Sequence, residues 1–148
     1  MAKVRVTRQF DFEMAHALPN YDGPCRNLHG HSYRLFVTVA GHPVNDKKNP
    51  KHGMVIDFGD LKRLVREEIV NELDHAVMIS SDVPADQYEN IDMLSKLHLV
   101  DYQPTCENMV IDFAWRIKSK LPPGIELVSL RLNETATSYA EWVASDNP

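Results

Sequence analysis

Two stretches of this chain alternate between apolar and polar residues, and that period of two constrains the fold more than any other feature. The first stretch covers residues 3–15 and the second covers residues 32–40. Successive side chains on a β-strand point to opposite faces, so alternation predicts strands with one buried face and one solvent-facing side. We therefore predict that two long, half-buried strands open the chain.

The hydrophobic period changes to 3.6 residues further along, which predicts two helices. The apolar face of the first runs through Leu61–Ile69, with Asp57 or Gly59–Asp60 as its start. The second helix is capped within Thr105–Cys106 and is ended by Pro122–Gly124.

The sequence patterns in the rest of the chain predict shorter strands and turns. Two final strands, Glu126–Leu132 and Ser138–Val143, are predicted to form a hairpin, and a short strand is predicted at Met54–Phe58. Residues 80–104 are polar and predict an irregular segment, with a helical turn at Ile91–Leu97.

The resulting order is approximately ββααββ. Two helices on one face of an antiparallel sheet make an α+β domain, which we expect to cover residues 1–148 as a single unit. A length of 148 residues, 43% of them hydrophobic, is sufficient for a buried core. Such a short sheet has open edges, so oligomerisation through the sheet is expected.

Composition excludes several classes of function. The net charge of −5 gives no general attraction to nucleic acid or to an anionic membrane. No apolar run approaches the roughly 20 residues that span a bilayer, and the N-terminus lacks the apolar stretch of a signal peptide. The two cysteines are too few for a disulfide framework, which favours a reducing, cytoplasmic location.

Three of the seven histidines have the spacing of a metal site. His29 and His31 lie two residues apart at the start of the second strand, so both imidazoles point to one face, about 6.6 Å apart along it. His16 ends the first strand, where an antiparallel neighbour begins. Three neutral imidazoles leave a fourth position free, as in a catalytic zinc site. We therefore predict Zn²⁺ bound by His16, His29 and His31.

Cys25, four residues before His29, has two functional interpretations. It is either a fourth ligand that closes the site or a thiolate base kept off the metal, with a pKa lowered by the metal and by Arg26. Cys106, at a helix start, is expected to be inert or mildly reactive.

Three acidic groups are further candidates. Asp74 precedes His75, and a carboxylate beside an imidazole suits general acid–base work. Glu107 and Glu134 have carboxylates that can accept two parallel hydrogen bonds from an N–C–N edge, as in a 2-aminopyrimidinone ring. For Glu107, a helix-capping role is the simpler interpretation.

Six short motifs together resemble the 6-pyruvoyltetrahydropterin synthase / 6-carboxytetrahydropterin synthase family. They follow the family's order from residue 10 to residue 143, nearly the whole chain. The motifs are His16, Cys25–Tyr33, Ile56–Lys62, Leu73–His75, Pro104–Asn108 and Asn133–Thr135.

The resemblance implies the tunnelling fold (T-fold), in which ββααββ subunits form a trimeric β-barrel and two trimers stack into a homohexamer. It also implies active sites at subunit interfaces and a zinc ion on the three histidines. In this family pattern Cys25 is the proton acceptor and Asp74 with His75 is the proton relay. Glu134, counted with the catalytic residues, holds the 2-amino and ring N–H groups of the pterin.

Thr105 and Glu107 match a segment that lines the pterin pocket. The stretch Ser80–Gln103 is longer than in compact bacterial members, and Ala76–Ile79 stands where the family commonly has Leu-Asn.

Family members act on 7,8-dihydroneopterin triphosphate. One branch releases triphosphate and leaves a pyruvoyl side chain. The other releases triphosphate and acetaldehyde, and leaves a carboxylate at C6 that feeds queuosine and other deazapurine pathways. The short spacing from Cys25 to His29, with Leu28 before the pair, is more similar to the carboxy branch.

The sequence leaves several alternatives open. They are a pyruvoyl-forming enzyme, a non-catalytic zinc-stabilised pterin-binding oligomer, and a protein similar to dihydroneopterin aldolase or to the cyclohydrolases. The triphosphate needs cationic partners, which the sequence does not rank. The candidates are Arg8, Arg26, Lys47, Lys48 and Lys51.

Overall fold

The two long strands predicted at the start of the chain form an antiparallel pair in the computed structural model, which describes residues 1–148. Strand β1 (Val4–His16) pairs with β2 (His29–Gly41) along its whole length, from Val4 opposite Gly41 to His16 opposite His29. This register places the ends of the pair that carry the histidines side by side.

The sheet has six strands in the order β4-β3-β1-β2-β5-β6. The predicted C-terminal hairpin is confirmed as β5 (Glu126–Asn133) and β6 (Tyr139–Val143), and β5 adds to β2. The other side of the sheet was not predicted. There β3 (Ala76–Ser80) pairs parallel with β1, and β4 (Leu97–Val100) pairs parallel with β3.

The sheet is therefore mixed, and the expectation of a wholly antiparallel sheet is wrong. Strand β3 is buried at four of its five residues, so it shows no apolar–polar alternation to reveal it. Strand β4 has only four residues, within the segment predicted to be irregular. The helical turn predicted at Ile91–Leu97 is a 3₁₀ turn, η4, at Asp92–Leu94.

The strand predicted at Met54–Phe58 is also wrong, because its last residues start a helix. Asp57 is the N-cap of α1 (Phe58–Val65), and its side chain accepts a hydrogen bond from the Gly59 amide at 2.7 Å. The helix continues through a π-helical segment, η2 (Arg66–Val70), into α2 (Asn71–Leu73).

The second predicted helix is α3 (Cys106–Lys118). Its N-cap is Thr105, whose hydroxyl accepts a hydrogen bond from the Asn108 amide at 3.2 Å. The helix ends at Lys118, a few residues before Pro122–Gly124. None of the helices is long and apolar enough to cross a membrane.

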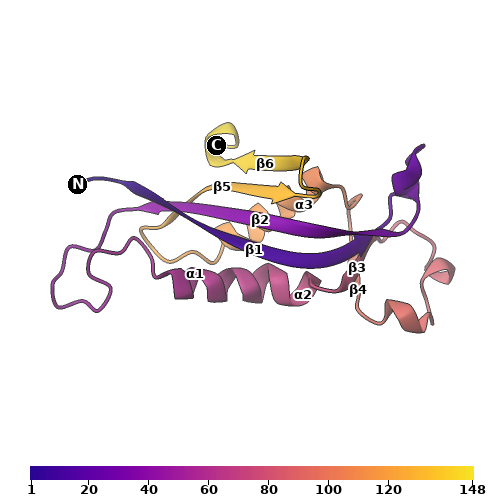
Figure 1. The fold of residues 1–148 in the computed structure, drawn as a ribbon, viewed down its shortest axis with the longest axis horizontal. Helices are drawn as coiled ribbons and strands as arrows, with labels where there is room; N and C mark the ends of the chain where they lie inside the picture. The colour runs from indigo at the N-terminus through magenta and orange to yellow at the C-terminus, as the bar shows by residue number, and fades with distance from the viewer.

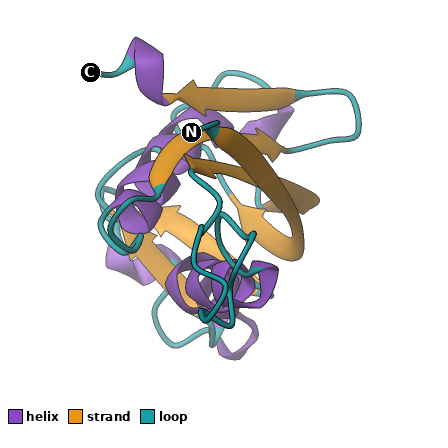
Figure 2. Ribbon diagram, turned by 90° about the vertical axis from the view of Figure 1, so that its left-hand side faces the viewer, coloured by secondary structure: helices purple, strands orange, loops and turns teal.

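Both helices pack on one face of the sheet, which curls around them (Figures 1 and 2). The core is filled by apolar side chains that alternate along the strands and by the inner faces of the helices. Fully buried examples from the helices are Leu61, Val65, Ile69, Leu73, Met109, Phe113 and Ile117. The α+β class is confirmed, with β3 and β4 placed between the two helices of the expected ββααββ order. The opposite face of β1 and β2 is polar and exposed.

Candidate metal centre and active site

Three histidines converge at one end of the β1–β2 pair. His16, His29 and His31 offer ligand nitrogens that all lie within 4.8 Å of one another. The pairing of His16 with His29 brings the first two together, and His31 lies two residues further along the same face of β2. We call these three residues the histidine cluster.

Backbone carbonyls orient two of these imidazoles. The Nδ1 atom of His16 lies 2.7 Å from the carbonyl oxygen of Pro104, and the Nδ1 atom of His29 lies 2.6 Å from that of Asn27. A carbonyl can only accept, so each Nδ1 carries the proton and each Nε2 presents its lone pair. Metal-binding histidines are commonly held by such a hydrogen bond on the second ring nitrogen.

The nitrogens that face inward fit a metal ion. The Nε2 atoms of His16 and His29 are 3.2 Å apart, close to the roughly 3.4 Å between two nitrogens at about 2.1 Å from a tetrahedral zinc. The Nε2 atom of His31 is buried and has no hydrogen-bond partner. Burial lowers the pKa of both His16 and His31, which favours the neutral imidazole that binds metals. The cluster is therefore compatible with a metal site.

The Glu134 carboxylate lies against the histidine cluster. One of its oxygens is 3.4 Å from Nε2 of His16 and 3.5 Å from Nε2 of His31. Glu134 follows the end of β5, and the pairing of Arg34 with Asn133 carries it to this position. The sequence prediction for Glu134 concerned only the pterin, and its closeness to the histidines was missed because it depends on a non-local strand pairing.

The two cysteines have different surroundings. Cys25 lies in a 3₁₀ turn, η1 (Pro24–Arg26), is half-buried, and is not a member of the histidine cluster. The thiol of Cys25 is therefore not grouped with the three ligand nitrogens. Cys106 is buried, its thiol donates to the Leu132 carbonyl at 3.1 Å, and burial raises its pKa to about 11. Cys106 is therefore a protonated, structural thiol.

Asp74 and His75, which we call the relay pair, are in contact with each other. The Asp74 carboxylate lies 3.1 Å from Nδ1 of His75. It also accepts a hydrogen bond of 2.9 Å from the backbone amide of Glu13. The His75 amide donates back to the Glu13 carbonyl at 2.6 Å. His75 has a φ of 65°, in the left-handed region, and its side chain is 76% exposed.

The relay pair does not meet the histidine cluster within one chain. His75 borders a shallow hollow of about 320 Å³ with Glu13 and Ser32. Glu13 and Ser32 alternate with Met14 and His31 along the strands, so they point to the opposite face of the sheet. His31 also borders this hollow, but the His75 imidazole has no hydrogen bond or ion pair with the cluster.

The segment before α3 is only partly in the site. Pro104 contacts His16, whereas Thr105 caps the helix and Glu107 is exposed in its first turn. The simpler interpretation of Glu107, as a residue that favours the helix N-terminus, agrees with this position.

Tyr33 was not predicted as a site residue. It follows His29 and His31 at the same two-residue spacing, and its ring centroid lies 5.6 Å from that of His31. Its hydroxyl is buried without a hydrogen-bond partner, and burial raises its pKa, so it stays protonated. The spacing along the strand was the signal that could have identified it.

Replacing Tyr33 with phenylalanine is expected to stabilise the metal-free protein by about 1 kcal/mol, since it removes a buried hydroxyl that has no partner. Urea unfolding after metal removal measures this change. Tyr102→Phe is the matched control: the Tyr102 hydroxyl donates to Asp112 at 2.6 Å, so its loss is expected to destabilise. A destabilising Tyr33→Phe would contradict the assignment of an unpartnered hydroxyl.

The curled sheet, the two helices on one of its faces and the histidine cluster at one end of the β1–β2 pair together define a T-fold protein with a candidate metal centre. The family profile of 6-pyruvoyl tetrahydropterin synthase matches residues 5–144. The chain belongs to this family.

Relatives with assigned names agree with that membership. The chain is 35% identical over 142 residues to a 6-carboxy-5,6,7,8-tetrahydropterin synthase of Haemophilus influenzae, covering 93% of this chain and 97% of the relative. It is 32% identical over 137 residues to the protein of the same name from Synechocystis, covering 93% and 91%.

Solved structures show the same fold. An uncharacterized protein from Wolinella succinogenes superposes with a TM-score of 0.76 at 21% identity, covering 97% of this chain and 99% of that one. The 6-pyruvoyl tetrahydropterin synthase of Caenorhabditis elegans gives a TM-score of 0.68 at 24% identity, covering 97% and 96%.

Proposed function

We propose that the protein is a zinc-dependent lyase that converts 7,8-dihydroneopterin triphosphate and water to 6-carboxy-5,6,7,8-tetrahydropterin, acetaldehyde and triphosphate. The observation that carries the proposal is the approach of three histidine ligand nitrogens to within 4.8 Å of one another, with a free cysteine outside this set. The names of the relatives from Haemophilus influenzae and Synechocystis support the carboxy product over the pyruvoyl one. The free thiol suits a cytoplasmic location.

Zinc bound to the histidine cluster would act as a Lewis acid that makes protons next to the substrate's side-chain hydroxyls more acidic. Neutral His16, His29 and His31 would hold it. The Cys25 thiolate would accept a proton from the side chain, in a turn exposed enough to reach it.

Glu134 and the relay pair complete the proposed site. With their Nε2 lone pairs on a metal, His16 and His31 have no proton to offer Glu134 at that position. The Glu134 carboxylate is then free to accept two hydrogen bonds from the pterin's 2-amino and ring N–H groups. Asp74 holds Nδ1 of His75, which leaves Nε2 of His75 to exchange a proton with the substrate.

A homo-oligomer follows from this proposal, because the relay pair makes no hydrogen bond or ion pair with the histidine cluster of its own chain. A site that uses both takes the relay pair from a neighbouring chain. The short edge strands β4 and β6 leave backbone groups free for pairing between subunits. A hexamer built from two trimers would provide such neighbours.

Incubation of the zinc-loaded protein with 7,8-dihydroneopterin triphosphate tests the proposed reaction. We expect acetaldehyde, triphosphate and a pterin with a carboxylate at C6, all detectable by mass spectrometry. A 6-pyruvoyl product without acetaldehyde would instead assign the protein to the pyruvoyl-forming branch of the family. No turnover with bound zinc would favour a non-catalytic pterin-binding protein.

A further inference from the structure

A polar cleft of about 520 Å³ lies beside the loop that joins β1 to β2. That loop contributes Asn20, Arg26 and Asn27 to its walls. The segment that follows β3 contributes Asp82 and Gln87. Seven of its ten lining residues are polar or charged, so the cleft suits a hydrated, polar group rather than an aromatic ring.

The cleft adjoins the metal centre through two backbone segments. The Asn27 carbonyl, at one wall, accepts the hydrogen bond from His29. Gln103, at another wall, precedes Pro104, whose carbonyl accepts the hydrogen bond from His16. The cleft therefore lies next to the backbone that orients His16 and His29, and Arg26 in its wall directly follows Cys25.

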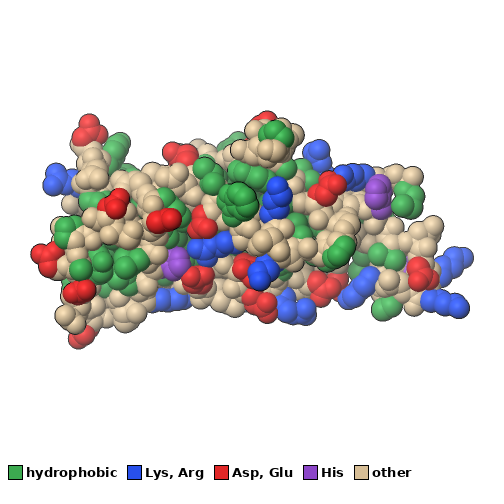
Figure 3. All heavy atoms as spheres, turned by 180° about the vertical axis from the view of Figure 1, so that it is seen from behind, with side chains coloured by type: hydrophobic (Ala, Val, Ile, Leu, Met, Phe, Trp, Pro, Cys, Tyr) green, Lys and Arg blue, Asp and Glu red, His purple; other side chains and the backbone are tan.

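Four of the five predicted triphosphate cations lie elsewhere. Lys47, Lys48 and Lys51 belong to the loop between β2 and α1, where basic side chains gather at the right-hand end of Figure 3, away from the histidine end of the sheet. Lys51 is also ion-paired with Asp57. Arg8 lies in the middle of β1 and donates to a backbone carbonyl at the start of α1, 3.1 Å away.

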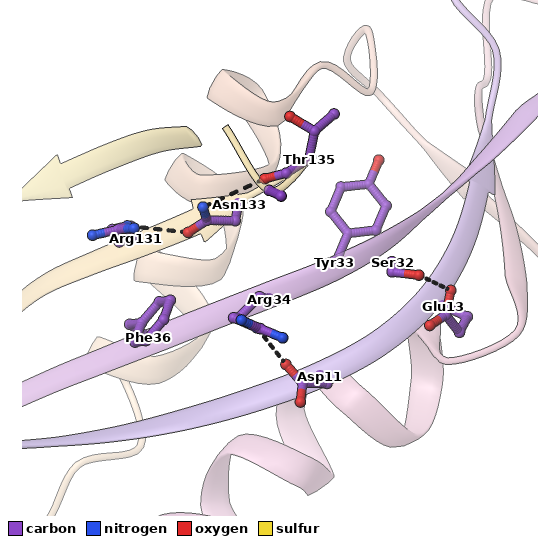
Figure 4. Close-up of a pocket in the computed structure, with 10 residues that line it drawn as sticks. Asp11, Glu13, Ser32, Tyr33, Arg34, Phe36, Arg131, Asn133 and Thr135 are labelled. Atoms are coloured by element: carbon purple, nitrogen blue, oxygen red, sulfur yellow. Dashed lines mark hydrogen bonds and ion pairs between the residues drawn. The ribbon is translucent and has the colours of Figure 1, made fainter. Parts of the chain in front are cut away.

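Two arginines on the polar sheet face, Arg34 and Arg131, are already engaged. Arg34 pairs with Asp11 at 3.2 Å, as the dashed line in Figure 4 shows. The Arg131 guanidinium lies between the rings of Phe36 and Tyr139, 5.1 and 4.0 Å from their centroids. Arg34 and Arg131 therefore already interact with other side chains, which weakens their attraction for an anionic ligand.

Arg26 differs from these cations in position and in partners. It directly follows Cys25, lines the cleft, is exposed, and has no ion pair or side-chain hydrogen bond. A guanidinium presents a planar fork of N–H donors that matches two phosphate oxygens.

We propose that Arg26 anchors the triphosphate of the substrate in this cleft. The inference rests on the proposed function, since it identifies the part of that site which takes the phosphates. Asp82 is the one acidic side chain of the cleft and opposes an anionic ligand, so its removal changes affinity in the opposite direction to the removal of Arg26.

Calorimetric titration with inorganic tripolyphosphate tests the inference without turnover. Arg26→Gln is expected to weaken binding about ten- to a hundredfold, the usual range for a charge-assisted hydrogen-bonded contact. Arg26→Lys should recover part of the affinity, and Asp82→Asn should tighten it about two- to fivefold. Lys48→Gln, a cation at the other end of the sheet, is the matched control and is expected to bind as the wild type does.

The substrate assay separates this inference from the proposed function. With an active enzyme, Arg26→Gln should raise KM for 7,8-dihydroneopterin triphosphate and leave affinity for unphosphorylated 7,8-dihydroneopterin and zinc content unchanged. An inactive wild type that binds tripolyphosphate through Arg26 would overturn the function and keep the anchor. An active wild type that does not bind tripolyphosphate, or an Arg26→Gln variant with unchanged KM and affinity, would overturn the anchor alone.

Discussion

Cys25→Ala is expected to lower turnover of 7,8-dihydroneopterin triphosphate by about a thousandfold or more, while zinc stays bound. The physical reason is that the thiolate is assigned as the base and lies outside the histidine cluster, so its loss removes proton transfer and leaves all three imidazoles in place. Metal content by atomic absorption and single-turnover kinetics measure the two parts of this result.

Cys106→Ala is the matched control for this substitution. Its thiol is buried and bonded to the Leu132 carbonyl, with a raised pKa, so turnover should remain while stability falls slightly. Loss of zinc from Cys25→Ala would make Cys25 a ligand and the site a structural one.

Mixed oligomers of Cys25→Ala and His75→Ala chains are expected to regain activity that neither variant has alone. In the proposed oligomer the relay pair serves the site of a neighbouring chain, so an active site needs Cys25 from one chain and His75 from another. Random assembly then leaves about a quarter of the sites with both groups intact. Co-expression of two differently tagged chains, followed by tandem purification and assay, measures the recovery.

A second mixture makes the control for this experiment. Glu134 contacts His16 and His31 of its own chain, so it belongs to the same half of the site as the cluster and Cys25. Mixing Cys25→Ala with Glu134→Gln chains should restore nothing. Recovery in this mixture, or its absence with His75→Ala, would show that the site is divided between chains in another way.

The histidine cluster could be predicted from sequence because it depends on local periodicity and one hairpin register. Alternation along β1 and β2 defines which face each histidine occupies, and antiparallel pairing brings His16 beside His29. The helix starts were predictable for the same reason, since Asp57 and Thr105 are capping residues next to the helices they begin.

Other parts of the fold and site depend on contacts between distant segments. The parallel pairing of β3 with β1 has no alternation to reveal it, because β3 is almost fully buried. The Pro104 carbonyl reaches His16 across 88 residues of sequence, and Glu134 reaches the cluster only through the β2–β5 pairing. The unpartnered hydroxyl of Tyr33 likewise depends on packing that a pattern does not encode.

The left-handed backbone of His75 has a consequence for how this position can evolve. A side chain with φ near 65° is destabilised relative to glycine by about 1 kcal/mol or more, and histidine gains nothing there from burial. Drift under selection for folding alone would lead to glycine or asparagine at this turn. The histidine at this turn therefore costs stability that a glycine there would not, which is the trade-off expected if its imidazole is the proposed proton relay.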